Sequence, residues 1–161
     1  MKLILFSDGS VNPKQGLGFG AYLELSEMPG DIGTIRALIK VKRFENTSST
    51  KLELQTLLWA LSEISSKKII SYTDSQNIAG LLSRKKQLEE KNFCSKNGRP
   101  LSNAELYRDF FKKTEKFDIQ FQQVNGHKPS SQKNSIDKIF SLVDRASRNA
   151  LRTYTESNAT R

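Results

Sequence analysis

The sequence has one cysteine, one histidine and one tryptophan among its 161 residues. A single cysteine can form no disulfide within the chain, so a disulfide-stapled fold is excluded, as is a metal site built from several thiolates. A metal ion bound by this chain would therefore need oxygen ligands or the imidazole of His127.

Long apolar runs are also missing. The first run, Leu3–Phe6, is too short for the core of a signal peptide. No stretch of the sequence approaches the roughly 20 apolar residues of a membrane-spanning helix. We therefore expect a cytoplasmic protein that has no membrane partner.

The chain length suits one compact domain and is short for two. We expect a single domain over residues 1–153, followed by a frayed tail over residues 154–161. No feature of the sequence indicates an obligate protein partner, so we expect a monomer.

Acidic residues are in the minority, with 17 Asp and Glu against 26 Lys and Arg and a net charge of +9. More than half of this excess lies in the segment 81–116, which holds ten basic and five acidic residues. A surface field of one sign concentrates partners of the opposite charge, so a polyanion, with nucleic acid as the first choice, is the expected partner.

The apolar pattern predicts a mixed α/β sheet with helices packed on its faces. The order is three strands that form an antiparallel meander, a helix, a strand, two helices, a strand and a final helix. Strands are expected at 3–6, 19–25, 34–44, 68–73 and 117–124, and helices at 48–64, 77–83, 102–111 and 136–150.

Two of the predicted strands end in a carboxylate that is followed by polar residues, at Asp8 and at Asp74. Asp8 either closes an Asx-type turn or binds a cation, because an ionised carboxylate beside a dry core needs a partner. Glu53 lies in the opening turns of the first long helix, where a solvated side chain facing the helix dipole is the simpler explanation. Asp137 and Asp144 lie seven residues apart, on nearly the same face of the final helix.

If the strands of Asp8 and Asp74 are neighbours, their carboxylates meet at one edge of the sheet, where Glu53 and an aspartate of the final helix can join them. Such a cluster needs divalent cations, and oxygen ligands favour Mg²⁺ or Mn²⁺. Two such ions about 3.5 to 4 Å apart activate a water for attack on a phosphodiester. A basic protein with an acidic site is thus explained, since the basic segment holds a polyanion by its phosphates.

Five short motifs in order carry a family resemblance: SDGS at Asp8, KLELQ at Glu53, TDSQ at Asp74, VNGH at His127 and DRASR at Asp144. From Leu3 to about Leu151 the chain resembles type 1 ribonuclease H. The resemblance implies a ribonuclease H-like fold, with a five-stranded mixed sheet of three antiparallel and two parallel strands and helices on both faces. It also implies hydrolysis of the RNA strand of RNA·DNA hybrids with two Mg²⁺ ions, for which Mn²⁺ can substitute, leaving 3′-hydroxyl and 5′-phosphate ends.

The resemblance assigns the metal-ligand role to Asp8, Glu53, Asp74 and an aspartate of the last helix. Asp144 matches the local motif, whereas Asp137 matches the usual distance from the histidine, and we favour Asp144. His127 would assist proton transfer or product departure. Substrate contacts are expected at Gly9, Ser10, Asn12, Ser49, Thr50, Gln76, Lys85, Lys86, Asn103 and Tyr107.

Two features of the sequence depart from the family pattern. Ser49 and Thr50 stand where the family commonly has two asparagines that contact the hybrid in its minor groove. The basic segment that follows Arg84 is similar to the family's basic protrusion, but has few aromatic residues. The alternative function is a catalytically weak or inactive module on the same fold that binds hybrids or double-stranded RNA.

Overall fold

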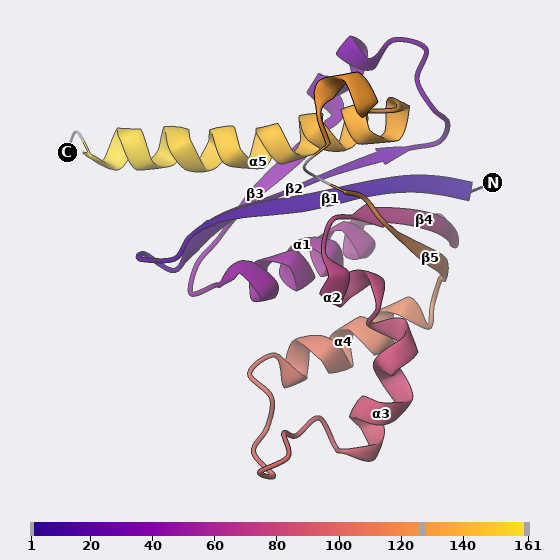
Figure 1. Ribbon diagram of the computed structural model, residues 1–161, viewed down its shortest axis with the longest axis vertical. Coiled ribbons are helices and arrows are strands. Elements are labelled where there is room, and N and C mark those ends of the chain that lie inside the picture. Colours follow the sequence, from indigo (N-terminus) through magenta and orange to yellow (C-terminus); the bar gives the residue numbers. More distant parts are fainter. Residues whose placement is uncertain (1, 126–127, 160–161) are drawn as a thin grey trace.

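The computed structural model describes residues 2–125 and 128–159, which form one five-stranded sheet with helices on both faces (Figure 1). The strands are β1 (Lys2–Asn12), β2 (Leu17–Leu25), β3 (Lys40–Phe44), β4 (Lys68–Thr73) and β5 (Asp118–Gln123). The α-helices are α1 (Ser49–Glu63), α2 (Gln76–Ala79), α3 (Lys85–Glu90), α4 (Ala104–Thr114) and α5 (Ser135–Ala159), and three short 3-10 helices are Ile32–Leu38, Leu82–Arg84 and Ser130–Gln132.

The sheet order is β3-β2-β1-β4-β5. The pairs β1·β2 and β2·β3 are antiparallel, and the pairs β1·β4 and β4·β5 are parallel. This arrangement confirms the predicted fold, with β1 in the centre of the sheet. Within the described residues, no helix combines the length and the apolar character that crossing a membrane requires.

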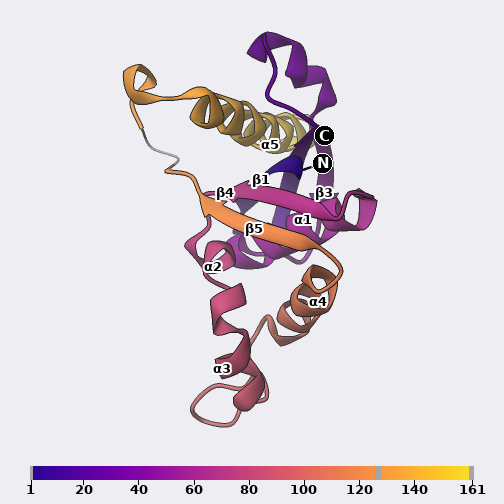
Figure 2. The same ribbon diagram turned by 90° about the vertical axis from the view of Figure 1, so that its right-hand side faces the viewer.

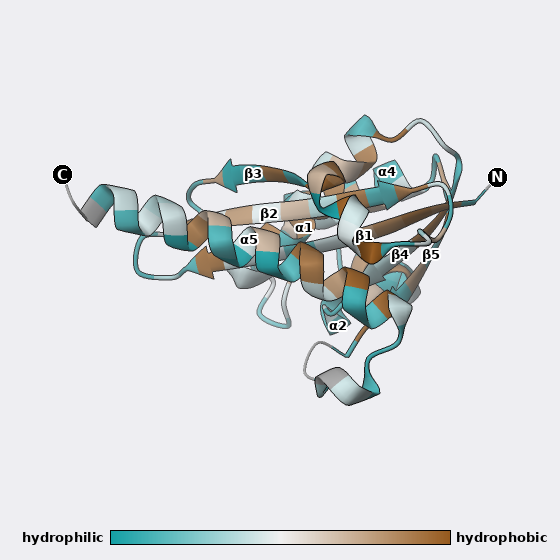
Figure 3. Ribbon diagram, turned by 90° about the horizontal axis from the view of Figure 1, so that it is seen from above, coloured by the Kyte–Doolittle hydropathy of each residue, from teal (hydrophilic) through white to brown (hydrophobic). Residues whose placement is uncertain are grey.

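Two hydrophobic clusters cover the two faces of the sheet, as alternation along β1 requires. Leu5 is fully buried in the cluster that includes residues of α1 and α4. Phe6, the next residue, is fully buried in the cluster that includes Val143 of α5. Figure 3 shows how apolar and polar residues alternate along α5, so this long helix presents one apolar stripe to the sheet.

The helix α1 packs against β2 at two glycines, Gly18 and Gly20. A Cβ atom at Gly20 would lie 2.1 Å from the Thr56 hydroxyl oxygen, and one at Gly18 would lie 2.7 Å from Leu52. Real Cβ atoms do not lie this close to other atoms, and because the contact at Gly20 also involves the Thr56 Cβ, at 2.9 Å, a glycine is needed there for this close approach. The contact fixes how near α1, and with it Glu53, lies to the sheet.

The predicted third strand, 34–44, is correct only in its second part. Residues Ile32–Leu38 form a 3-10 helix, and β3 is limited to Lys40–Phe44. Asp31 caps the 3-10 helix, since its side chain accepts a hydrogen bond from the Gly33 amide at 3.0 Å. The only buried residue of this helix is Ile35, so a local cap and one apolar anchor prevail over the strand pattern.

The predicted frayed tail differs from the structure over residues 154–159, where α5 continues as far as Ala159. The reason is an aromatic anchor. The ring of Tyr154 lies 5.8 Å from that of Phe19 on β2, and the Arg43 guanidinium lies 5.3 Å from the centre of the Tyr154 ring. These contacts hold the end of α5 against the sheet.

Residues 81–116 form a basic lobe that projects away from the sheet (Figure 2). Just before and at the start of the lobe, the helix predicted at 77–83 is divided into α2 and the 3-10 helix Leu82–Arg84. The helix α3, inside the lobe, was not predicted. Phe93 is 7% exposed inside the lobe, and the Arg108 guanidinium lies 4.6 Å from the centre of its ring. The lobe therefore has an apolar interior of its own, continuous with the core below α1.

Candidate active site

The register of the sheet brings Asp8 and Asp74 to adjacent positions. Phe6 of β1 pairs with Tyr72 of β4, and each aspartate follows two residues later on its own chain segment. Because β1 and β4 are parallel, the two carboxylates lie at the same edge of the pair. Asp8 is 8% exposed, whereas Asp74 is exposed to solvent.

Asp8 also meets Asp144, from the middle of α5. Burial raises the pKa of Asp8 to about 9, and a hydrogen bond with the Asp144 side chain and the negative charges of Asp74 and Asp144 act in the same direction. Without a cation, the Asp8 carboxyl thus keeps a proton at neutral pH and donates a hydrogen bond to the Asp144 side chain. Carboxylates that oppose one another in this way are typical of functional sites.

Glu53 approaches the same group from α1. Burial raises the pKa of this half-buried carboxyl, a hydrogen bond with the Ser75 side chain counteracts the rise, and the charge of Asp74 adds to it. The Ser75 hydroxyl also accepts a hydrogen bond from the Ile78 amide at 3.2 Å, which caps α2. Ser75 thereby ties the turn after β4 to Glu53, a role that the sequence did not suggest.

Asp144 has a cationic neighbour one helical turn away. Its Oδ2 atom lies 2.7 Å from Nη2 of Arg148, and the Asp144 side chain is 32% exposed. The Ser147 hydroxyl lies 3.1 Å from that of Ser10, so α5 and β1 are joined next to the acidic group. The Asp–Arg spacing of four residues is a signal that helical periodicity could have supplied.

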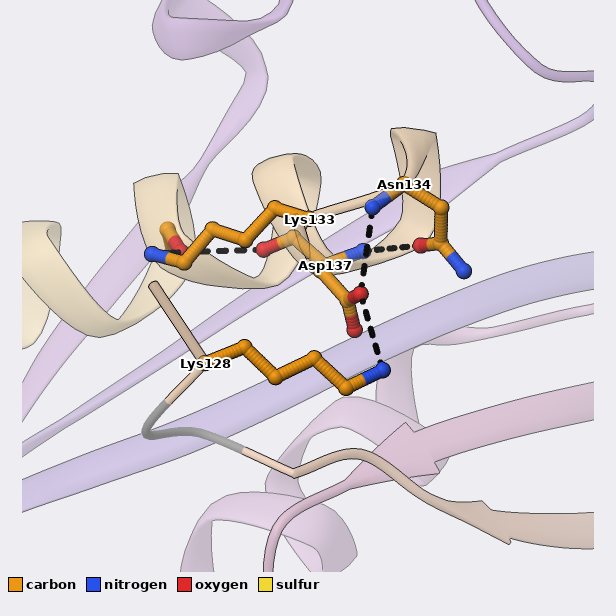
Figure 4. A network of polar contacts seen from close by, with 5 residues as sticks. Lys128, Lys133, Asn134 and Asp137 are labelled. Atoms are coloured by element: carbon orange, nitrogen blue, oxygen red, sulfur yellow. Dashed lines mark hydrogen bonds and ion pairs between the residues drawn. The ribbon is translucent and has the colours of Figure 1, made fainter. Parts of the chain in front are cut away.

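Asp137, the competitor of Asp144, has different contacts. Its Oδ2 atom accepts hydrogen bonds from Lys128 Nζ at 3.3 Å and from the Asn134 amide at 3.2 Å. The Asp137 amide in turn donates to Asn134 Oδ1 at 2.9 Å, which completes the reciprocal pattern of a capping box at the start of α5 (Figure 4). Asp137 is 6% exposed, and these contacts are with donors rather than with other acids.

Among the described residues, no three His, Cys, Asp or Glu side chains are arranged so that they could hold one metal ion together. The donor chemistry nevertheless suits Mg²⁺, because Asp8, Glu53, Asp74 and Asp144 offer oxygen ligands only. The raised pKa of Asp8 points the same way, since a divalent cation would favour the ionised form that burial and the neighbouring acids now oppose.

The residues for which substrate contacts were predicted fall into two groups. The first lies on or next to the elements that carry the acidic residues: Gly9, Ser10 and Asn12 on β1, Ser49 and Thr50 in the first turn of α1, and Gln76 at the start of α2. The second lies in the basic lobe: Lys85, Lys86, Asn103 and Tyr107. His127 lies outside the described residues, so its predicted role stays a prediction.

Tyr107 is 8% exposed and packs in the hydrophobic cluster that includes residues of α1 and α4, which leaves little of its ring free to stack on a base, so its substrate contact stays a prediction. Lys85 is also less available than predicted, since its Nζ atom lies 3.0 Å from Glu115 and 4.0 Å from Glu89.

Comparisons with known proteins agree with this geometry. Ribonuclease H of Rickettsia typhi is 27% identical over 143 residues, which cover 86% of this chain and 88% of that protein. Ribonuclease HI of Rickettsia prowazekii is 26% identical over 142 residues, with coverage of 86% and 88%. The sequence profile of the RNase H family matches residues 1–150. With a match over nearly its whole length, the chain belongs to the RNase H family.

Proposed function

We propose that this protein is an endonuclease that hydrolyses the RNA strand of RNA·DNA hybrids. The observation that carries the proposal is the meeting of carboxylates from β1, α1, the end of β4 and α5 on the fold of the RNase H family. The relatives with which the chain aligns are named ribonuclease H or HI, which supports the same activity.

Two Mg²⁺ ions, held by Asp8, Glu53, Asp74 and Asp144, would supply an activated water and stabilise the leaving oxygen, so that 3′-hydroxyl and 5′-phosphate ends result. Mn²⁺ would substitute for Mg²⁺ at such oxygen ligands. The contacts of Asp144 with Asp8 support its place in this set over Asp137, whose carboxylate is held by Lys128 and Asn134.

The protein's own residues orient these acids. The central strand β1 positions Asp8, because Asp8 is paired with Ala21 of β2 and lies two residues after the last pair between β1 and β4. The Ser75 hydroxyl positions Glu53, and Arg148 fixes the Asp144 side chain. His127 would transfer a proton or assist product departure after cleavage. Ser49 and Thr50, exposed at the start of α1, would place their hydroxyls on the hybrid's minor groove.

The test is cleavage of labelled RNA·DNA hybrid, double-stranded RNA and double-stranded DNA with Mg²⁺. We expect cleavage of the hybrid's RNA strand alone, because 2′-hydroxyls across a wide minor groove distinguish the hybrid from DNA. Mass analysis of the products then gives the chemistry of the new ends.

Asp74→Asn is the matched control, since it removes one proposed ligand charge from an exposed position without a change of size. We expect it to lose cleavage and to keep hybrid binding. A wild-type protein that binds hybrid but leaves it intact at every Mg²⁺ and Mn²⁺ concentration would be a binding module instead, and the enzyme proposal would fail. A cytoplasmic location and a monomeric state remain predictions from the sequence.

A further inference from the structure

A groove separates the turn between β1 and β2 from the second half of α5. It has a volume of about 1000 Å³. One wall is formed by Val11, Asn12 and Pro13, and the other by residues between Arg145 and Glu156. Both walls begin where the acidic group ends, because β1 carries Asp8 and α5 carries Asp144 just before them.

The helix wall of the groove is cationic. Arg145, Arg148 and Arg152 line it and are exposed, whereas the only acid among the lining residues is Glu156, at the far end. Other lining residues, Asn12, Asn149 and Thr155, add amide and hydroxyl groups. Guanidinium, amide and hydroxyl donors are the groups that proteins use to contact the phosphates of a nucleic-acid backbone.

Two of the arginines, Arg148 and Arg152, continue the flank of α5 on which Asp144 lies. Arg148 and Arg152 follow Asp144 by four and eight residues, which places them about 6 and 12 Å further along the helix axis. Arg148 joins the two sites physically, since its guanidinium lies 2.7 Å from the Asp144 carboxylate. A strand that leaves the acidic group along α5 would therefore meet Arg148 and then Arg152.

The distal part of the groove is held in place from the other side of α5. The ring of Tyr154 packs against Phe19 and the Arg43 guanidinium, at 5.8 and 5.3 Å. Arg152 and Glu156 lie beyond residue 150, where the match to the RNase H family profile ends. The groove is thus completed by an extension of α5 that the family profile does not cover.

We propose that this groove binds the phosphodiester backbone of the nucleic-acid substrate where it runs past the acidic group. The inference rests on the proposed function and extends it to a second region of substrate contact. Arg145 and Arg152 provide the phosphate contacts, and Arg148 links the groove to Asp144. Because these contacts are with the backbone, they increase affinity without selecting a base sequence.

The test measures binding of a fluorescently labelled RNA·DNA hybrid by anisotropy over a range of salt concentrations, without divalent cations so that no cleavage occurs. A hybrid of about 20 base pairs extends beyond the groove at 3.4 Å per base pair, whereas one of about 6 base pairs is too short to fill both the site and the groove. The variants are Arg145→Gln with Arg152→Gln, and a control that combines Lys67→Gln with Lys68→Gln. The control removes the same charge from exposed residues at the start of β4, away from Asp74.

For the long hybrid, we expect the arginine double variant to lower the slope of log K against log salt by about 2, since each phosphate contact contributes about 0.9. The control variant should keep the wild-type slope, and the short hybrid should show little difference between proteins. Arg152→Lys, which retains the charge, should restore most of the slope that Arg152→Gln loses.

An unchanged slope in a folded arginine double variant, or an equal loss in the lysine control, would overturn the groove proposal. Circular dichroism and thermal unfolding show whether each variant is folded, and the single arginine variants replace the double variant if it is not. The outcome is independent of the cleavage assay. A wild-type protein that fails to cleave hybrid but shows the arginine-dependent slope would refute the enzyme and support the groove.

Discussion

Two regions of α5, its first turn and its middle, each place one aspartate near the sheet, and the two aspartates have opposite surroundings. Asp137 in the first turn accepts hydrogen bonds from Lys128 and from the Asn134 amide. Asp144, two turns later, faces the carboxyl group of Asp8 and forms an ion pair with Arg148. Sequence spacing puts both on nearly the same face of the helix.

The difference separates a carboxylate that stabilises the fold from one that opposes it. A buried acid surrounded by donors lowers the free energy of the folded state, as at Asp137. An acid placed against other acids raises it, unless a cation is bound, as in the group around Asp8. Local arrangements that work against stability are expected where the protein binds or reacts.

The largest effect that we expect from this comparison is on activity. Asp144→Asn should lower the rate of hybrid cleavage by at least about 100-fold. Loss of a residue that only orients a metal ligand costs up to about 100-fold, and loss of a ligand itself should cost more. Asp137→Asn should lower it by less than about 10-fold, because its contacts are with the start of α5. Single-turnover cleavage of labelled hybrid measures both, and the reverse ranking would show that Asp137 is the ligand.

The second effect is on the pH dependence of stability. The pKa of Asp8 rises from 3.8 to about 9 on folding, so between these values the folded state holds a proton that the unfolded chain has lost. The free energy of unfolding of the metal-free protein should therefore decrease as pH rises from about 4 towards 9. Urea unfolding in the presence of a chelator measures this decrease.

Asp8→Asn is the control for that experiment, because it removes the titrating group and keeps its shape. The variant should lose the decrease, and Mg²⁺ at pH 8 should stabilise the wild type but not the variant. Identical pH profiles for the two proteins would contradict the assignment of the proton to Asp8.

A smaller effect is expected when the cap of α5 is removed. Asp137→Ala should lower the free energy of unfolding by about 1–3 kcal/mol, because the part-buried hydrogen bond from the Asn134 amide and the ion pair with Lys128 are lost. In metal-free buffer, Asp144→Ala should lower the free energy of unfolding by less, since this substitution removes a carboxylate that lies against Asp8. Equal losses of stability would show that the two aspartates do not differ as described.

The smallest effect concerns Lys128 itself. Its side chain is 36% exposed, and such an ion pair contributes about 0–1 kcal/mol. Lys128→Met should therefore cost less stability than Asp137→Ala, because the Asn134 amide still reaches the carboxylate. A loss of stability as large as that of Asp137→Ala would show that Lys128, and not the Asn134 amide, makes the main stabilising contact with Asp137.

Much of the fold could be predicted because its signals are local. The apolar runs that end at Asp8 and Asp74 mark two strands, and the leucine stripe after Ser48 marks α1. The 3-10 helix at 32–38 escaped prediction, since its residues also fit a strand and the cap by Asp31 decides between them. The length of α5 escaped because Tyr154 is anchored by Phe19, which is distant in the sequence.

The candidate site divides in the same way. The positions of Asp8 and Asp74 follow from strand endings, and Asp144 was favoured through its motif. The contacts of Ser75 with Glu53 depend on how α1 packs beside the turn after β4, which no sequence period encodes. The burial of Tyr107 escaped for a related reason, since its ring packs in a cluster that includes residues of α1, which are distant in the sequence.

The close approach of Gly20 to Thr56 links two positions outside the acidic group. A methyl group at position 20 would collide with the Thr56 side chain, so α1 would have to move outward and carry Glu53 with it. A smaller residue at position 56 is the simplest way to absorb such a change. We therefore expect the two positions to vary together, so that a relative with a larger residue in place of Gly20 also has a smaller residue in place of Thr56.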